Sequence, residues 1–237
     1  MPDYIFAPVD TPCLKIAGGT EHFPVHRIYC IGRNYAEHAR EMGAMPDQGT
    51  PVFFLKPADA ITALPGPVRY PPGTHDLHHE IELVAALHRG GRDIDASDAL
   101  ECVYGYAIGL DLTRRDLQSA AKAKGLPWDT GKSFEQSAPI GPIYRVADIG
   151  HPAQGAITLD VNEQRRQRGD LRDRLFSLSE IIATLSRLFT LAPGDLIFTG
   201  TPAGVGPLNP GDRFLAAIEG LGTVEGTIVA DESPISA

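Results

Sequence analysis

The sequence predicts a β-rich mixed α/β fold, in which a mixed β-sandwich or rolled sheet is flanked by a few helices. Twenty prolines and 25 glycines are scattered along the 237 residues, and the apolar stretches between them are short. Such punctuation is typical of many short strands and turns and argues against a helical bundle. Strand-like and helix-like segments also do not alternate regularly, which disfavours a doubly wound sheet or an α/β barrel.

Eight segments show the apolar runs, or the alternation of apolar and polar residues, that strands require. In chain order they are Arg27–Ile31, Val52–Leu55, Leu77–Leu87, Tyr104–Asp111, Ala156–Val161, Asp195–Phe198, Arg213–Ile218 and Gly222–Val229. No internal repeat or low-complexity segment interrupts them.

Helical patterns are fewer and occur in three segments. They are Tyr35–Met42, Arg114–Lys124 and Ser179–Phe189. Thr113 precedes the second segment, and we expect it to cap that helix, with Asp116 three residues later. Ser177 precedes the third segment, and Glu180 completes a capping box with it.

Composition and charge exclude several classes of function. The formal net charge is −9 and no block of Lys and Arg occurs, so we expect no nucleic acid partner. No apolar run approaches the length that crosses a membrane, and the N-terminus lacks the features of a signal peptide. The three cysteines, Cys13, Cys30 and Cys102, have neither disulfide nor metal-site spacing. We therefore expect reduced thiols in a cytoplasmic protein.

A candidate metal site lies in the predicted strand Leu77–Leu87. Alternation places Glu80 and Glu82 on one face of it, roughly 6.5 to 7 Å apart. The next predicted strand is apolar until it ends on Asp111, a common position for a metal ligand or catalytic group. His78 shares the face of the glutamates, as a fourth ligand or as a hydrogen-bonding neighbour. From the pattern alone, a solvated acidic strand face with a turn acid explains these residues at least as well.

A site built from three carboxylates without a thiolate would be an all-oxygen site. Such a site favours Mg²⁺ or Mn²⁺, with Ca²⁺ as a further candidate and Zn²⁺ less suited. Coordination positions would remain open for water and substrate. The sequence therefore predicts a hard divalent cation if a metal binds.

Seven segments of the chain resemble the fumarylacetoacetate hydrolase family, in the order of that family. They are Cys30–His38, Phe54–Pro57, His79–Leu83, Gly109–Gln118, Lys124–Trp128, Gly131–Phe134 and Thr199–Gly206. Within the family, the chain looks most like the short acylpyruvate and fumarylpyruvate hydrolases. The resemblance implies a mixed β-roll and a homodimer. It also implies hydrolysis of an acylpyruvate such as fumarylpyruvate to pyruvate and fumarate, as in the breakdown of aromatic compounds.

The resemblance also assigns roles to individual residues. It implies that Glu80, Glu82 and Asp111 hold the metal, in agreement with the strand pattern. His38 and Glu41 match the catalytic pair of the family. Because they are three residues apart in a helical segment, their side chains share a face and Glu41 can orient the imidazole.

The other candidates would bind the substrate. Lys132 and Gln118 match family positions near the substrate and could stabilise charge on the attacked carbonyl. Arg115 is three residues before Gln118 and shares its helix face. Arg114 is a further candidate that a surface salt bridge would also explain. The loop around Thr201 lacks the ending of a nucleotide-binding P-loop, and the family uses this threonine to hold a carboxylate.

The expected mechanism has two parts, a metal that stabilises the departing pyruvate enolate and His38, which activates water. We expect residues 1–237 to form a single catalytic domain, with residues 1–26 as an N-terminal extension and residues 34–50 as a mobile lid over the metal. A fumaryl group would bring a second carboxylate, for which Arg33 is the first candidate partner. The nearest alternative is decarboxylation of oxaloacetate, which produces the same enolate. A catalytically silent binding protein on the same fold is the alternative from another class.

Overall fold

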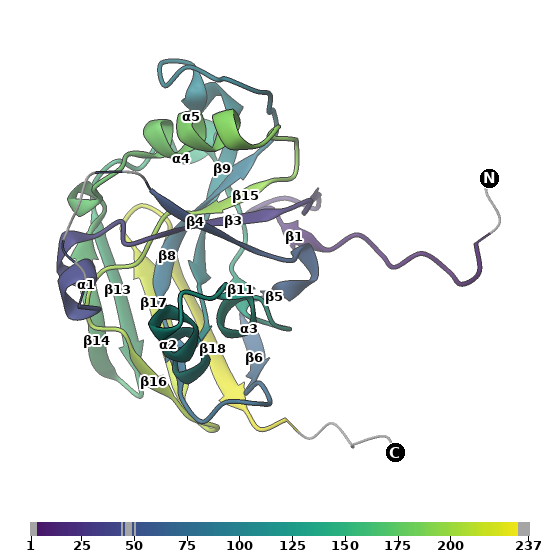
Figure 1. The fold of residues 1–237 in the computed structure, drawn as a ribbon. Helices are drawn as coiled ribbons and strands as arrows, with labels where there is room; N and C mark the ends of the chain where they lie inside the picture. Colours follow the sequence, from purple (N-terminus) through teal and green to yellow (C-terminus); the bar gives the residue numbers. More distant parts are fainter. Residues whose placement is uncertain (1–3, 44, 46–48, 50, 232–237) are drawn as a thin grey trace.

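The computed structural model describes residues 4–43, 45, 49 and 51–231, which form a β-rich roll with a few helices outside it (Figure 1). The largest sheet has eight strands in mixed orientation. Its order is β4 (Val52–Lys56), β3 (Ile28–Gly32), β15 (Leu196–Phe198), β8 (Ile81–Leu87), β9 (Val103–Leu110), β11 (Ala138–Ile140) and β5 (Ile61–Ala63), and β12 (Tyr144–Arg145) also pairs with β9. The predicted fold class is confirmed.

A second sheet of five strands lies beside the first, and alternate residues along its strand β17 are buried. Its order is β14 (Gln164–Asp170), β13 (Ala156–Val161), β17 (Arg213–Ile218), β18 (Gly222–Val229) and β6 (Gly66–Arg69). The main core joins this sheet to one face of β8, where Leu83 and Ala85 belong to the same apolar cluster as Leu159 and Ala216. The predicted apolar face of β8 is therefore the face toward the main core.

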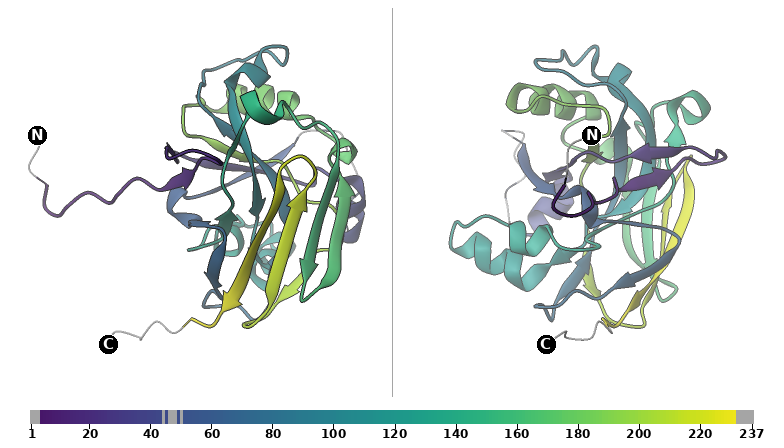
Figure 2. Two further views of the ribbon diagram at one scale, coloured as in Figure 1. Left: turned by 180° about the vertical axis from the view of Figure 1, so that it is seen from behind. Right: turned by 90° about the vertical axis from the view of Figure 1, so that its right-hand side faces the viewer.

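The opposite face of β8 is buried as well. Val84 and Ala86 belong to a second apolar cluster that includes Leu14 and Phe23. These last two residues come from a two-stranded sheet of β1 (Cys13–Lys15) and β2 (His22–Pro24). The predicted N-terminal extension, residues 1–26, thus contributes strands that cover the large sheet. The segment before β1 runs away from the roll and is exposed (Figure 2).

The predicted strand Leu77–Leu87 is not continuous, and this prediction was wrong in one respect. It is divided at Glu80 into β7, which ends at His79, and β8. A small three-stranded sheet of β10 (Thr113–Arg114), β7 (Leu77–His79) and β16 (Gly206–Leu208) takes up the first part. Glu80, a residue of the candidate metal site, lies at this break.

Five α-helices are described, and α5 lies toward the other end of the roll from α2 and α3 (Figure 1). They are α1 (Ala36–Glu41), α2 (Arg115–Ala123), α3 (Asp129–Lys132), α4 (Val146–Ile149) and α5 (Leu178–Leu188). The predicted capping box of Ser177 and Glu180 is confirmed at α5. The predicted cap of α2 by Thr113 was wrong, because Arg114 takes the N-cap position and no side chain caps the helix.

Two further predictions concern the lid segment and the cysteines. The predicted lid, residues 34–50, contains α1, but residues 44, 46–48 and 50 lie outside the described residues. The three cysteines are free, with Cys30 and Cys102 buried. Within the described part of the chain, no helix is both long and apolar enough to cross a bilayer.

Candidate active site

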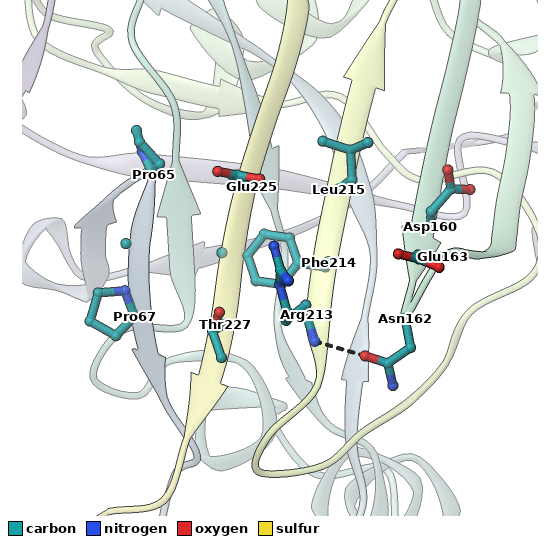
Figure 3. Close-up of a pocket in the computed structure, with 12 residues that line it drawn as sticks. Pro65, Pro67, Asp160, Asn162, Glu163, Arg213, Phe214, Leu215, Glu225 and Thr227 are labelled. Carbon is teal, nitrogen blue, oxygen red and sulfur yellow. Dashed lines mark hydrogen bonds between the residues drawn. The ribbon is translucent and has the colours of Figure 1, made fainter.

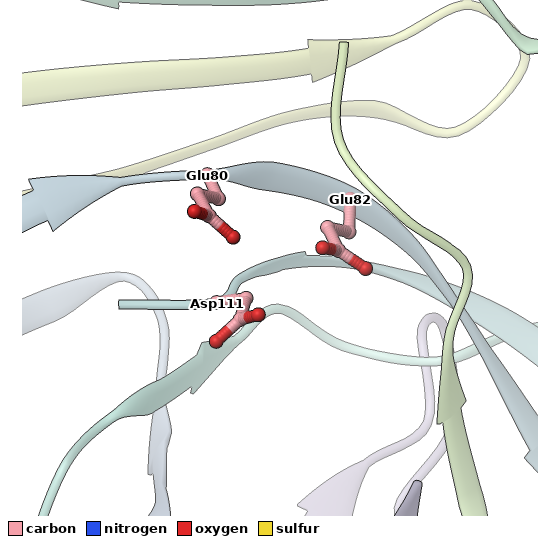
Figure 4. Close-up of side chains that lie close together, drawn as sticks. All are labelled: Glu80, Glu82 and Asp111. Atoms are coloured by element: carbon pink, nitrogen blue, oxygen red, sulfur yellow. The ribbon is translucent and has the colours of Figure 1, made fainter. Parts of the chain in front are cut away.

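Three buried carboxylates converge where β8 and β9 meet (Figure 4). Glu80 and Asp111 lie opposite each other because Ile81 pairs with Leu110 in the ladder, and the Asp111 N–H donates to the Glu80 carbonyl at 2.8 Å. One oxygen of each of Glu80, Glu82 and Asp111 lies within 4.8 Å of the other two. The side chains of Glu80 and Glu82, two residues apart in the chain, thus bring their carboxylates together with that of Asp111.

Lys132, at the end of α3, bridges two of the acids. Its Nζ donates to Glu80 Oε2 at 2.8 Å, to Asp111 Oδ2 at 2.7 Å and to the Thr113 hydroxyl at 2.7 Å. Although burial disfavours its charge, the charges of Asp111 and Glu80 raise the pKa of Lys132. An ammonium group has three N–H donors, and here all three are used.

Two more basic side chains contact the acids. Arg115 donates to Glu80 through Nη2, and through Nη1 to Gln118 Oε1 at 2.5 Å. Lys56 is buried with its Nζ 2.9 Å from Asp111 Oδ1. Burial opposes the charge of Glu80, but Lys132 and then Arg115 hold its pKa well below the ordinary value.

Glu82 is the acid that lacks a basic partner. Among the described residues no ion pair reaches it, and its Oε2 accepts the Gly200 N–H at 2.6 Å. Burial, followed by the negative charges of Asp111 and Glu80, raises its pKa well above the ordinary value. Asp111 Oδ1 is likewise buried without a hydrogen bond, although it lies near Lys56.

These features fit a divalent cation. A dication near Glu82 would supply the positive charge that this buried carboxylate lacks. The oxygens of Glu80 that accept hydrogen bonds keep a second lone pair each. An all-oxygen set of carboxylates suits Mg²⁺ or Mn²⁺. That Glu80, Glu82 and Asp111 act as ligands stays a prediction.

His38 and Glu41 form the predicted pair on α1. His38 is buried, and its Nδ1 lies 3.1 Å from Glu41 Oε2. The two oxygens of Glu41 also accept the Gly204 N–H, at 3.0 and 3.2 Å. Burial disfavours the carboxylate, but the hydrogen bonds from His38 and Gly204 lower the pKa of Glu41. A charged Glu41 therefore ties the helix to the glycine loop and leaves His38 Nε2 as the ring nitrogen for other partners.

A cavity of about 40 Å³ joins these groups. Nine of the ten predicted site residues line it: Arg33, His38, Glu80, Glu82, Asp111, Arg115, Gln118, Lys132 and Thr201. Glu41 is the exception, because it lies behind His38. Residues separated by more than 160 positions in the sequence thus meet at one site, as the resemblance implied.

Two candidates lie elsewhere. His78 was considered as a fourth ligand, but its Nε2 is 2.9 Å from Asp76 Oδ1 and its Nδ1 accepts a long hydrogen bond from Arg115. It is therefore a hydrogen-bonding neighbour. Arg114 does not line the cavity, since its guanidinium lies 4.4 Å from the ring centroid of Phe134. The stacking of Arg114 on an aromatic ring replaces the expected surface salt bridge.

Sequence reasoning missed several groups at the site. Lys56 and Thr113 contact the acids and Lys132, and Lys122 lines the cavity. A lysine directly after the apolar run of β4 is an unusual residue to bury, and this was a usable signal for Lys56. Nothing in the local sequence distinguishes Lys122 from its exposed neighbour Lys124.

A second, larger hollow lies away from the acids. It measures about 910 Å³ and is lined by β6, β17, β18 and the turn at Asn162 (Figure 3). Of its acids, Asp160 is paired with Arg165. This hollow shares no residue with the carboxylate cavity, and its lining contains no set of groups suited to catalysis or metal binding.

Comparison with known proteins decides the family. The model of the fumarylacetoacetate (FAA) hydrolase C-terminal domain matches residues 27–229. The chain belongs to the fumarylacetoacetate hydrolase family. This membership confirms the resemblance drawn from the seven segments, and it makes the chain a member of a family of hydrolases, isomerases and tautomerases.

The similar solved structures and the similar relatives are named after different reactions. The fumarylpyruvate hydrolase of Pseudomonas aeruginosa, solved with Mn²⁺ and pyruvate, is 49% identical, with a TM-score of 0.94 over 97% of this chain and 100% of that chain. The mitochondrial oxaloacetate tautomerase of Bos taurus is 43% identical over 82% of this chain and 87% of its own length. The oxaloacetate tautomerase of Escherichia coli is 37% identical over 86% and 93%.

Proposed function

We propose that this protein hydrolyses the carbon-carbon bond of an acylpyruvate of the fumarylpyruvate type, giving pyruvate and a carboxylic acid such as fumarate. The pairing of His38 with Glu41 beside the buried carboxylate cluster carries this proposal, because it adds a general base to a site for a divalent cation. The similarity to the hydrolase of Pseudomonas aeruginosa supports it. Mg²⁺ or Mn²⁺ held by Glu80, Glu82 and Asp111 would supply Lewis-acid stabilisation of the departing enolate.

The proposed chemistry begins with a water held near His38. The water oxygen adds to the acyl carbonyl carbon while its proton passes to His38 Nε2, and Glu41 stabilises the imidazolium that forms. The bond from that carbon to the pyruvyl methylene then breaks, and its electron pair stays with the methylene as an enolate. The His38 imidazolium returns its proton to the methylene, which gives pyruvate and restores the base, and the acyl carbon leaves as a carboxylic acid.

The donors around the cavity divide the remaining work. Gln118 accepts from Arg115 through its oxygen, so its amide N–H groups remain for a substrate oxygen. Lys132 has no N–H left over, since all three contact Glu80, Asp111 and Thr113. We therefore propose that Lys132 acts by holding the two acids in place, and that Gln118 and Arg115 contact the substrate.

Two basic side chains in the lining of the cavity suit a second carboxylate of the substrate. Arg33 and Lys122 both line the cavity, and neither forms an ion pair in the described part of the chain. Burial, and then the charges of Arg33 and Arg115, lower the pKa of Lys122. Two cations held close together, neither of them in an ion pair among the described residues, favour an anionic ligand. We propose that they bind the distal carboxylate of the substrate.

An apolar hollow of about 300 Å³ offers a different place for the acyl group. It shares Phe54, Trp128 and Lys132 with the cavity. An uncharged acyl chain would enter this hollow, whereas a fumaryl group would face Arg33. Comparing fumarylpyruvate with an acylpyruvate that has a neutral aliphatic acyl group therefore tests the substrate class directly.

Oxaloacetate tautomerisation is the second candidate, because relatives at 37 to 43% identity carry that name. It needs a proton moved at the methylene but no attack by water. Decarboxylation of oxaloacetate, the alternative considered from the sequence, needs no attack by water either. The variant His38→Ala tests the proposed base, with the exposed His22→Ala as its matched control. We expect release of pyruvate from fumarylpyruvate to fall at least about a hundredfold in His38→Ala. Unchanged hydrolysis in this variant would contradict the proposal. Absence of hydrolysis in the unmodified protein, together with rapid conversion of enol to keto oxaloacetate, would favour tautomerisation.

The proposed setting is a cytoplasmic homodimer. The segment before β1 exposes Ile5, Phe6 and Val9, and an exposed apolar segment of this kind often packs on a partner chain. We expect light scattering to report a dimer, and the double substitution Ile5→Ser with Phe6→Ser to weaken it. A monomeric unmodified chain would contradict this proposal without touching the proposed chemistry.

A further inference from the structure

Gln167 is a buried amide on an otherwise exposed stretch of strand. It lies on β14, whose residues on either side of it are exposed, while Gln167 itself is 0% exposed. It pairs with Leu159 in the five-stranded sheet. A buried amide needs hydrogen-bond partners, and those of Gln167 lie in two segments of the candidate site.

The side chain of Gln167 uses its whole hydrogen-bonding capacity. Its Oε1 accepts from His79 Nδ1 at 2.9 Å and from the Ile81 N–H at 3.1 Å. Its Nε2 donates to the Thr201 hydroxyl and to the Pro202 carbonyl, each at 2.8 Å. An amide has two N–H donors and two lone pairs, so all four are occupied. The Ile81 N–H can only donate and the Pro202 carbonyl can only accept, which fixes the orientation of the amide.

This orientation decides what Thr201 can do. Because the Thr201 oxygen accepts from Gln167, its single hydroxyl hydrogen is not used in that contact. Thr201 is buried and lines the cavity. Its hydrogen is therefore available to donate to a ligand oxygen, as a carboxylate requires.

The same amide also contacts both chain neighbours of Glu80. Glu80 lies between His79 and Ile81, which are both held by Gln167 Oε1. The position is also the break between β7 and β8, where the regular strand ends and the ladder to β9 begins. Gln167 thus holds the imidazole of the residue before Glu80 and the backbone N–H of the residue after it.

We propose that Gln167 is a positioning residue of this site, which makes the Thr201 hydroxyl a donor toward the carboxylate of the pyruvyl group and holds the backbone around Glu80. The inference rests on the proposed function, since it assigns a substrate carboxylate to Thr201. Gln167 acts through Thr201 and Glu80 and does not need to contact the substrate.

A double-mutant cycle on ligand binding tests the link to Thr201. The variants are Gln167→Met, Thr201→Val and their combination, and calorimetry measures oxalate binding to the protein loaded with Mn²⁺. We expect each single variant to weaken oxalate binding about tenfold, since each removes one hydrogen bond to a charged group. Because the hydroxyl is already misdirected in Gln167→Met, adding Thr201→Val should weaken binding less than about threefold further. Effects that multiply in the double variant would overturn the proposal.

Controls separate positioning from a general loss of structure. Gln164→Met makes the same change on the exposed part of β14 and should leave oxalate binding unchanged. Thr201→Ser keeps a hydroxyl and should keep most of the affinity. If Gln167→Met does not fold, Gln167→Glu takes its place in the cycle. It keeps the size of the side chain and an acceptor for Ile81, but its ionised form lacks both N–H donors. Adding Thr201→Val to it should therefore again weaken oxalate binding less than about threefold further.

Mn²⁺ affinity measures separately how Gln167 supports Glu80. Gln167→Met should weaken Mn²⁺ binding without oxalate, whereas Thr201→Val should not, because only Gln167 contacts the residues around Glu80. Equal Mn²⁺ affinity in both variants would remove this part of the proposal. If the chain binds oxalate but releases no pyruvate from acylpyruvates, the proposed function fails while the cycle still decides the role of Gln167. If pyruvate is released and the effects multiply, the role of Gln167 fails alone.

Discussion

The variant Glu82→Gln should be more stable than the unmodified chain without a divalent cation, and should lose the stabilisation that Mn²⁺ provides. Glu82 is 1% exposed and forms no ion pair among the described residues. Its pKa is raised by burial and by the charges of Asp111 and Glu80, so the fold disfavours its ionised form. Glutamine keeps the size of the side chain and an oxygen that accepts the Gly200 N–H. The substitution therefore removes the disfavoured charge with little change in packing.

The expected magnitudes follow from the burial of the site. An unpaired buried carboxylate costs several kcal/mol, but protonation relieves part of this, so we expect Glu82→Gln to gain about 1–3 kcal/mol without metal. Mn²⁺ at about one hundred times its Kd should stabilise the unmodified chain by about 2.7 kcal/mol. For a chain of this size, each kcal/mol shifts Tm by about 2–4 °C. The Mn²⁺ shift should therefore be roughly 5–10 °C in the unmodified protein and near zero in the variant.

Thermal unfolding followed by circular dichroism, after treatment with a chelator and then with added Mn²⁺, measures both effects. Glu225→Gln is the matched control, because it removes one acid from an exposed position on β18. The control should keep the full Mn²⁺ shift. A shift in Glu82→Gln as large as in the unmodified chain would refute the assignment of Glu82 as a ligand. The absence of any shift in the unmodified chain would refute the metal site as a whole.

Two further predictions concern stability. Burial opposes the charge of Glu41, but the hydrogen bond from His38 and one from a backbone amide lower its pKa below 4.5. The stability that charged Glu41 contributes is therefore present above pH 4.5 and is lost as the pH falls through the lowered pKa. Urea unfolding across an acid titration should therefore show a deficit in Glu41→Gln at neutral pH that disappears in acid, and a deficit independent of pH would contradict this. Gly109→Ala should destabilise by about 1–3 kcal/mol in urea unfolding, because its Cβ would lie 2.9 Å from Phe198 Cε1. Gly19→Ala, which meets only ordinary contacts, is its control, and an equal loss in both variants would contradict the steric reason.

Alternation predicted the strands whose apolar faces build the core, and it failed where a strand has few apolar residues. All eight predicted segments contain strands, because each buries at least one face in a sheet. Strand β14 was missed, since Gln164–Asp170 is polar and exposes most of its side chains. What holds it is its pairing with β13, where Thr158 lies opposite Arg168. Such pairing is set by a neighbouring strand and has no signature within the segment itself.

The candidate site was predicted in its members but not in its geometry. Alternation put Glu80 and Glu82 on one face, but it did not show that the strand is divided at Glu80. At this break the Ile81 N–H donates to Gln167, and His79 pairs with Gly206 of β16. These partners come from more than 80 residues further along the chain. No local pattern around Glu80 could therefore show that the strand ends there.

The directions of hydroxyl groups show where local reasoning must stop. Thr113 precedes a helix, and its sequence position predicts a cap, but its hydroxyl oxygen accepts from Lys132, which is 19 residues away in the chain. Thr201 likewise receives its hydrogen bond from Gln167, at a separation of 34 residues. In both cases an N–H donor from a distant segment occupies the oxygen and so decides where the hydrogen can point. Lys132 turns Thr113 toward the Asp111 carbonyl, whereas Gln167 leaves the hydrogen of Thr201 for a ligand. The two threonines therefore differ in function because of their donors, although each has the same hydroxyl group beside the same cluster of acids.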